Sequence, residues 1–264
     1  MDTPLSLIKK RPQDSHKGTF GTVKLLCGSN IYTGAATLCC EGALRSGCGI
    51  VKLFADELVC TPVRIRFPEV ISNIPAKFLE TEATAAVIGC GISDAHDGIL
   101  PEIFKKLNCP TVIDADGINF LARNKDVLRD AKLNAVFTPH PGEFGRLLNM
   151  DTEKINSDRV NLAVNFSRYH RCTLVLKGKN TIVATNGEQV FINDTGCSAL
   201  AKGGSGDVLA GVIGALLAQG YDNHSAAVIG VHVHGKASEI LSETYGESGV
   251  LPSDLPKMIG KLLG

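Results

Sequence analysis

The sequence predicts an α/β fold, a mostly parallel central sheet with helices on both faces and an antiparallel edge hairpin. Short runs rich in Val, Ile and Leu alternate with helical patterns, as parallel strands joined by helices require. The runs are continuously apolar, so both faces of the sheet should be covered. The hairpin is expected at 181–194, where two β runs flank Asn186-Gly187, a strong hairpin signal.

Six strands are expected between residues 23 and 178. They are residues 23–28, 49–54, 83–89, 110–116, 134–140 and 172–178, followed by the hairpin. Helical patterns are expected at 33–47, 97–107, 142–149, 152–169, 205–219, 223–243 and 253–263. No repeat, low-complexity segment or linker interrupts this alternation, so we expect residues 1–264 to form a single domain.

Composition restricts the partners and the compartment. Lys+Arg and Asp+Glu both total 27 in 264 residues, which argues against nucleic acid or an anionic membrane as the main partner. The nine cysteines form no CxxC pair and follow no secretory signal. We therefore expect mostly buried, reduced thiols in a cytoplasmic protein. The longest apolar stretch, 208–218, is too short and too rich in glycine to span a bilayer.

Polar segments follow the expected strands at the edge where a ligand pocket is expected. Ligands of such sheets bind beyond the carboxyl ends of the strands. There the sequence has "GSNIYTG", "GCGISD", "DADGIN", "TPHPGE" and "LKGKNT". The pocket is therefore expected at this edge.

The stretch "ALAKGGSGDVLAGVIGALLAQG" (199–220) turns a glycine loop into an apolar helix and places Asp207 at the junction. The helix is apolar on all sides, so its N-terminus should be rigidly held. Unpaired N–H groups and small residues there suit an anion such as phosphate. We expect the helix end to keep Asp207 ionised as the base that activates an attacking hydroxyl. The structural alternative is an ordinary N-cap. The loop is not a Walker A motif, because Asp207 stands where that motif has its lysine.

The chain resembles the ribokinase-like NAD(P)H-hydrate dehydratases. The resemblance begins with "GGSGDVLAG" and "LLAQG" and continues, in the same order, from about residue 15 to 255. The other segments that carry it are "HKGTFGTV", "CGSNIYTGAA", "DADGIN", "TPHPGEFGRLL", "LKGKNTIV" and "SGVLPSDL". It implies a ribokinase-like fold.

The resemblance also implies a repair activity. In this family a nucleotide phosphorylates the ring hydroxyl of hydrated NADH or NADPH, and phosphate then leaves and restores the double bond. Phosphate is a far better leaving group than hydroxide. Asp207 would be the base, and Gly204, Ser205 and Gly206 would form the anion hole around the transferring phosphoryl group.

Further positions match binding residues of the family. Ala35, Gly91, His140 and Asp207 match contacts to the hydrate. The contact to the nucleotide phosphates would be made by Lys177, Gly178, Lys179, Asn180 and Thr181, together with Gly206. Each has a structural alternative: Lys177 as a solvated strand end, Ala35 in helix–sheet packing, and His140 in a turn, with Glu143 as a first-turn acid.

Two segments depart from the family pattern, and two others raise a metal question. Cys90 and Cys197-Ser198 stand where relatives usually have proline and Asn-Pro, which affects the stiffness of both loops. Asp114 and Asp116, which end an expected strand, and Asn119 suit Mg²⁺ held through water. We expect Mg²⁺ with the nucleotide but no direct protein ligand. His232 and His234 are two residues apart on a helix, which is unlike a zinc pair.

Three other functions remain open from the residues. "AAVIGCGISD" resembles the start of a dinucleotide fingerprint, which would suit an NAD(P)-dependent oxidoreductase, although its third glycine position is Asp94. A ribokinase-like kinase of a vitamin precursor would share the glycine–aspartate corner. A catalytically silent nucleotide sensor would have little need for Asp207. The resemblance further implies a homo-oligomer that uses ADP or ATP and depends on a separate epimerase.

Overall fold

The computed structural model describes residues 4–130 and 134–264, and its centre is one nine-stranded sheet. Along the sheet the strand order is β3-β2-β1-β4-β5-β6-β7-β8-β9. The strands are β1 (Thr22–Leu26), β2 (Ile50–Phe54), β3 (Ile71–Asn73), β4 (Ala85–Ile88), β5 (Thr111–Ile113), β6 (Ala135–Phe137), β7 (Thr173–Leu176), β8 (Thr181–Thr185) and β9 (Gln189–Asn193). Strands β1 to β7 are all parallel to one another, whereas β8 pairs antiparallel with β7 and β9 pairs antiparallel with β8. The predicted α/β fold with an edge hairpin is confirmed.

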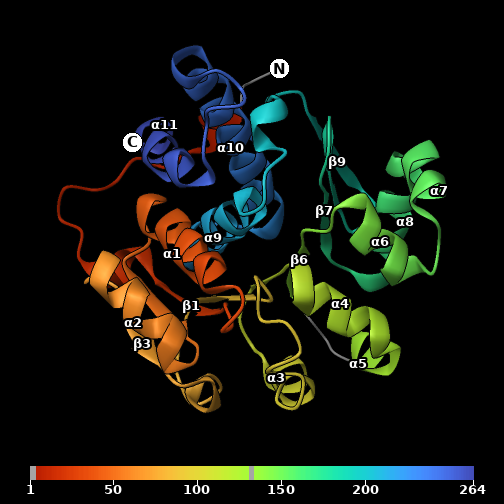
Figure 1. Ribbon diagram of the computed structural model, residues 1–264. Helices are drawn as coiled ribbons and strands as arrows, with labels where there is room; N and C mark the ends of the chain where they lie inside the picture. The colour runs from red at the N-terminus through yellow and green to blue at the C-terminus, as the bar shows by residue number, and fades with distance from the viewer. Residues whose placement is uncertain (1–3, 131–133) are drawn as a thin grey trace.

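Helices cover both faces of this sheet (Figure 1). They are α1 (Thr33–Arg45), α2 (Glu57–Arg66), α3 (Leu100–Lys106), α4 (Ala115–Arg123), α5 (Lys125–Asp130), α6 (Pro141–Leu148), α7 (Thr152–Ser157), α8 (Arg159–His170), α9 (Ser205–Ala218), α10 (Asn223–Tyr245) and α11 (Leu255–Leu263). Among the described residues, no helix combines the length and the apolar character that crossing a membrane requires.

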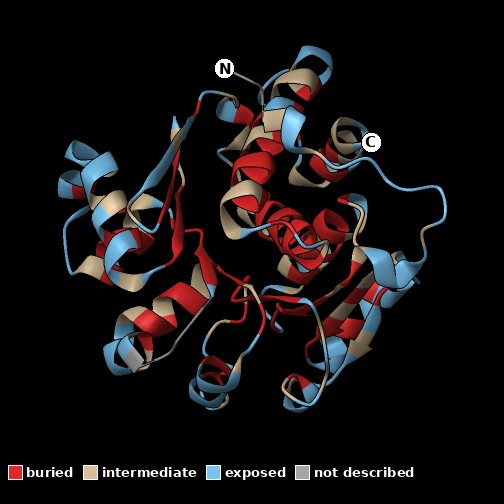
Figure 2. Ribbon diagram, turned by 180° about the vertical axis from the view of Figure 1, so that it is seen from behind, coloured by how far each residue is buried: buried red, intermediate tan, exposed pale blue. Residues whose placement is uncertain are grey.

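The sheet separates two hydrophobic cores. Alternate residues of a strand point to opposite faces, so Leu25 joins one core and Leu26 the other. The first core packs the sheet against α1, α2, α9 and α10, and the second packs it against α3, α4, α6 and α8. Burial is densest in α9 and the central strands (Figure 2). This two-sided burial explains why the strands read as continuous apolar runs.

Several elements differ from the sequence prediction. The expected helix at 152–169 is two helices, α7 and α8, which meet at Asp158. The expected strand at 110–116 ends at Ile113, and Ala115, with φ of +47°, begins α4. Elements α2, β3, α4 and α5 were not predicted individually. Strand β3 is only three residues long, and its pattern carries too little periodicity to be recognised.

Strand β1 pairs with both β2 and β4, so the chain reverses its direction of winding at this point. From β1 the chain continues to β2 and β3 on one side, and then crosses to β4 on the other. The carboxyl ends of two such strands leave a crevice between their loops. Here Gly28 donates its N–H to Cys90 O at 2.7 Å and joins the two loops.

Helices α1 and α9 pack closely because two glycines face the partner backbone. A Cβ at Gly42 would lie 2.5 Å from Val208 O, and one at Gly211 would lie 2.1 Å from Cys39 O. Both distances are too short for any side chain. The sequence therefore uses these glycines to bring α9 against α1, which fixes the direction of α9 over the sheet.

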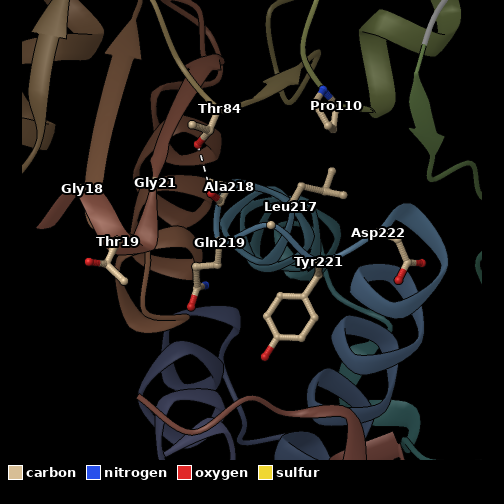
Figure 3. A pocket seen from close by; sticks show the side chains of 11 residues that line it. Gly18, Thr19, Gly21, Thr84, Pro110, Leu217, Ala218, Gln219, Tyr221 and Asp222 are labelled. Atoms are coloured by element: carbon tan, nitrogen blue, oxygen red, sulfur yellow. Dashed lines mark hydrogen bonds between the residues drawn. The ribbon is translucent and has the colours of Figure 1, made fainter. Parts of the chain in front are cut away.

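The C-terminal end of α9 is fixed at the opposite edge of the sheet (Figure 3). The Thr84 hydroxyl donates to Ala218 O at 3.0 Å, and a Cβ at Gly21 would lie 1.9 Å from the same oxygen. A shallow hollow of about 510 Å³ opens here. It lies at the amino ends of β1, β4 and β5, on the side away from the predicted site. The contacts of Thr84 and Gly21 in this hollow therefore fix the C-terminal end of the helix that carries Asp207.

We expect Gly211→Ala to destabilise the fold, because the new methyl group must displace the backbone of α1. Overpacking of this kind costs about 1–3 kcal/mol. Gly98→Ala is the matched control, since a Cβ there meets nothing within 4 Å. Urea unfolding of both variants measures the effect, and equal stabilities would contradict this account of the α1–α9 contact.

Candidate active site

A cavity of about 980 Å³ lies at the carboxyl ends of β5 and β7, beside the N-terminus of α9. It is lined by five groups of residues. They are the glycine loop and α9 start (200–207, with Leu209), the β7–β8 loop (177–181), the end of β9 and the segment after it (193–198), the residues Asp114, Ala115 and His140, and a last group of Val231, His234, Gly235 and Glu247. The structure thus brings Asp207, Gly204, Ser205, Gly206, His140 and all five residues from Lys177 to Thr181 to one cavity.

The N-terminus of α9 presents unpaired N–H groups to this cavity. Gly204 caps the helix with φ of +103°, a conformation that favours glycine. Within the described chain, the N–H groups of Gly206 and Asp207 donate to no other residue. Ser205 differs, because its N–H donates to Lys202 O at 3.3 Å and its hydroxyl donates to Leu200 O at 2.7 Å. Gly206 and Asp207 are therefore the donors left for an anion.

The carboxyl group of Asp207 is largely withdrawn from solvent. Burial, together with the Cys90 thiol and the Asp114 carboxylate, raises the pKa of Asp207 to about 9. Lys177 opposes the shift without cancelling it. The expectation that the helix end keeps Asp207 ionised is therefore not met in the protein without ligands, because burial and the neighbouring Cys90 and Asp114 raise the pKa of this carboxyl group.

Lys177 is the cation of the site. Its Nζ lies 2.7 Å from Asp114 Oδ1 and 3.9 Å from Glu143 Oε2. It also lies 3.3 Å from the position of a Cβ at Gly206, so any side chain there would crowd the ammonium group. Burial opposes the charge of Lys177, but Asp114 and Glu143 raise its pKa overall. Lys177 is thus a charged group on the cavity wall rather than a solvated strand end.

Arg159 of α8 fixes the β7–β8 loop by hydrogen bonds to backbone oxygens. Its guanidinium donates to Lys179 O at 2.6 Å, Leu176 O at 3.1 Å and Lys177 O at 3.2 Å. Gly178 and Asn180 both have positive φ, so the loop turns sharply over the cavity. These hydrogen bonds fix the position of the loop backbone and of Lys177 relative to the cavity.

His140 has the structural role in a turn that the sequence left open as its alternative. Its Nδ1 accepts from the N–H groups of Gly142 at 3.1 Å and Glu143 at 3.3 Å, and so caps α6. Glu143 reciprocates, because its Oε2 accepts from His140 N at 2.8 Å. Burial, with Lys177 and Arg146 nearby, lowers the pKa of His140, so the ring is held neutral. The ring still lines the cavity.

Ala35 and Gly91 lie beside each other but do not line the cavity that contains Asp207. A Cβ at Gly91 would lie 2.7 Å from both Ala35 Cβ and Tyr32 Cβ. Cys90, which precedes Gly91, reaches Asp207 with its thiol. The loop from Gly89 to Gly91 is followed by turns, and α3 begins only at Leu100. A dinucleotide fingerprint needs a helix directly after its glycines, so the oxidoreductase alternative lacks its structural element.

The segment at Cys197-Ser198, which departs from the family pattern, is fixed by hydrogen bonds. Cys197 N donates to Ser238 Oγ at 3.3 Å, and Gly196 N donates to Glu239 Oε1 at 2.8 Å, both on α10. The Ser198 hydroxyl is bonded to Glu247. These contacts stiffen the segment that proline stiffens in relatives.

The two histidines of α10 have separate surroundings. His234 is 6% exposed, and its Nε2 bonds to Ser205 O at 2.9 Å, whereas His232 Nδ1 has no partner within the described chain. Burial lowers the pKa of His234 to about 4. His234 is thus a neutral side chain that supports the start of α9 through Ser205 O.

The aspartates after β5 are engaged by the protein. Asp114 Oδ1 accepts from the Thr138 hydroxyl at 2.7 Å besides Lys177, and Asp116 accepts from Ser93 N at 2.8 Å and from Asn119. Sequence reasoning did not find the Asp114–Lys177 pair or the Arg159 brace. The signal available was that Asp114 and Lys177 each follow a parallel strand, which places both at one edge.

The family model for NAD(P)H-hydrate dehydratase matches residues 23–261. The "ADP-dependent (S)-NAD(P)H-hydrate dehydratase" of Neisseria meningitidis is 36% identical over 94% of this chain and 87% of its own length. An ADP/ATP-dependent NAD(P)H-hydrate dehydratase from Bacillus subtilis, co-crystallised with ATP and Mg²⁺, superposes with a TM-score of 0.87 at 28% identity, over 98% of this chain and 94% of that one.

A third relative is longer than this chain. The "Bifunctional NAD(P)H-hydrate repair enzyme" of Escherichia coli is 36% identical over 94% of this chain, which spans only 48% of that protein. The similarity therefore concerns about half of the bifunctional relative.

We expect Asp207→Asn to raise the melting temperature, by more at high pH. Between the usual aspartate pKa, about 4, and pH 9, the folded protein keeps the Asp207 proton that the unfolded chain has lost, so folding becomes less favourable as pH rises. Asparagine removes this cost. Thermal melts from pH 5 to pH 9 should show a gain that grows with pH, with exposed Asp14→Asn as the control. A gain that shrinks as pH rises would contradict the shift.

Proposed function

The chain belongs to the NAD(P)H-hydrate dehydratase family, and we propose that it converts hydrated NADH and NADPH to NADH and NADPH at the expense of ADP or ATP. One observation carries the proposal beyond the family match. The carboxyl group of Asp207 lies at the N-terminus of α9, beside N–H groups that no described residue uses. A base and an anion site are thereby adjacent.

The reaction that this site supports begins with phosphoryl transfer. The ring hydroxyl of the hydrate attacks the terminal phosphorus of the nucleotide, and the bond from phosphorus to the bridging oxygen breaks. Asp207 takes the hydroxyl proton. The phosphate then leaves with the former hydroxyl oxygen, the adjacent ring carbon loses a proton, and the double bond forms. The net result is loss of water from the hydrate and hydrolysis of the nucleotide.

The anion hole stabilises the charge that develops on the transferring group. We assign it to the N–H groups of Gly206 and Asp207, with Gly204 allowing close approach and Ser205 holding the loop by its own hydrogen bonds. Lys177 adds a positive charge next to Gly206. Because the side chains of Asp207 and Lys177 are largely buried, their interactions are stronger than in water.

The raised pKa of Asp207 is compatible with a base. A carboxylate with a higher pKa binds a proton more strongly. The difference between its pKa and that of the hydroxyl group it must deprotonate is therefore smaller. Only the ionised fraction reacts, however. The proposal therefore requires that activity of the free enzyme increases with pH toward about 9.

We place the nucleotide phosphates between the α9 start and the loop of Lys177, Gly178, Lys179, Asn180 and Thr181, which face one cavity. The hydrate would contact Ala35, Gly91 and His140 around Asp207. Mg²⁺ would arrive on the nucleotide phosphates and neutralise their charge. Asp114 and Asp116 already have partners, which supports an ion held through water rather than by a direct protein ligand.

The fold and the composition also support proposals about domain organisation, assembly and compartment. We propose that residues 1–264 form one domain, since one sheet runs from β1 to β9. We propose a homo-oligomer, because the edge strand β3 and neighbouring α2 expose Ile71 and Ile65. Free, mostly buried thiols suit the cytoplasm. The name of the bifunctional relative indicates a second repair activity in that protein, and we propose that this chain works together with an epimerase.

The decisive assay follows the absorption of NADH. Hydrated NADH incubated with the protein, Mg²⁺ and either ADP or ATP should regain the NADH band, whereas omission of nucleotide should leave the hydrate unchanged. Absence of recovery with both nucleotides, from protein shown to be folded, would defeat the proposed function.

Asp207→Asn should retain nucleotide binding and lose turnover by about 10²–10⁴-fold, the usual contribution of a general base. Binding is measured by calorimetry and turnover by the NADH band. In the wild type, kcat/KM should rise with pH up to about 9, because this ratio reports the free enzyme. A loss of only a few-fold, with the same pH dependence in the variant, would remove the base role.

A further inference from the structure

Three cysteines from separate elements meet beneath Asp207. Cys27 follows β1, Cys39 lies on α1 and Cys90 follows β4, and all three are 0% exposed. Their sulfur atoms all lie within 4.8 Å of one another, and Cys27 Sγ and Cys39 Sγ are 3.8 Å apart. All three are free thiols. The proposed reaction uses none of these sulfur atoms.

The spacing of the sulfur atoms suits a metal–thiolate centre. Zinc binds thiolates at about 2.3 Å in tetrahedral geometry, which separates neighbouring sulfur atoms by about 3.8 Å. The distance from Cys27 to Cys39 has this value before any ion binds. Cys90 Sγ lies within 4.8 Å of both and supplies the third sulfur atom. Thiolates select soft or borderline ions, so Mg²⁺ would not compete for this site.

A second cluster adjoins the three thiols. Cys90, Asp114 and Asp207 also have ligand atoms within 4.8 Å of one another, so Cys90 belongs to both clusters, whereas Asp207 is not within that distance of all three sulfur atoms. The Asp207 carboxyl group must therefore turn toward the sulfur atoms to reach an ion bound there. Asp114 Oδ1 is engaged with Lys177 and Thr138. No described residue other than Cys90 is bonded to the Asp207 carboxyl group, which leaves it the freer ligand. It also lines the cavity, so an ion can enter by way of Asp207.

We propose that Cys27, Cys39 and Cys90 form a binding site for a thiophilic divalent cation such as Zn²⁺, with Asp207 as the fourth ligand, and that occupation of this site inhibits the enzyme. Binding releases the three thiol protons and the Asp207 carboxyl proton to solvent and forms three metal–sulfur bonds and one metal–oxygen bond, with no change of oxidation state. The carboxylate is then unable to accept a proton from substrate. The metal site stands on the cluster alone, whereas the inhibition rests on the proposed function.

Cobalt(II) tests the metal site without any turnover. Titration of the reduced protein with Co²⁺ should produce the near-ultraviolet sulfur-to-cobalt charge-transfer band at one ion per chain, and added Zn²⁺ should remove the band. Cys39→Ala should weaken Co²⁺ binding by at least about 10-fold. Cys172→Ala is the matched control, because Cys172 is buried but lies in the other core. A missing band, or equal binding by the two variants, would overturn the site.

Zinc inhibition tests the second half of the proposal. Zn²⁺ should abolish hydrate repair by the wild type and the Cys172→Ala variant, a chelator should restore it, and Cys39→Ala should need at least about 10-fold more Zn²⁺. Equal sensitivity of the two variants would overturn the inhibition. Failure of the proposed function would appear differently, as no repair before Zn²⁺ is added, while the cobalt band would remain.

Discussion

The structure depends on the close contact between α1 and α9. Glycines at the crossing let the two backbones meet, and the end of α9 is tied to the start of the sheet by Thr84 and Gly21. A helix fixed along its whole length presents its N-terminus at one place. That place is the cavity at the carboxyl ends of β5 and β7, and the position of Asp207 beside free N–H groups is a consequence.

The charges of the site are few and strongly interdependent. Lys177 is shared between Asp114 and Glu143, while Asp207 remains a carboxyl group without a cation of its own. Burial then favours the neutral acid. A nucleotide with its metal ion would bring both the substrate phosphorus and new positive charge to this carboxyl group. The site is therefore arranged so that the base gains its charge together with the group on which it acts.

Sequence patterns were sufficient for the sheet and for the glycine–aspartate corner, because both depend on local signals. Apolar runs predicted six parallel strands, and Asn186-Gly187 predicted the hairpin. The protonation of Asp207 was not predictable, since it depends on Cys90 and Asp114, which are distant in sequence. The same holds for the Asp114–Lys177 pair and for the three-thiol cluster, each assembled by tertiary packing. The short β3 and the division between α7 and α8 were missed because neither has a distinctive local pattern.

The central claim is that Asp207 touches the hydroxyl group that attacks phosphorus. A crystal structure of the Asp207→Asn variant with hydrated NADH and a non-hydrolysable ATP analogue tests it most directly. The account predicts the amide of residue 207 within about 3.2 Å of the ring hydroxyl, with the terminal phosphate against the N–H group of Gly206. A hydroxyl group held elsewhere, or a terminal phosphate outside the glycine loop, would contradict it.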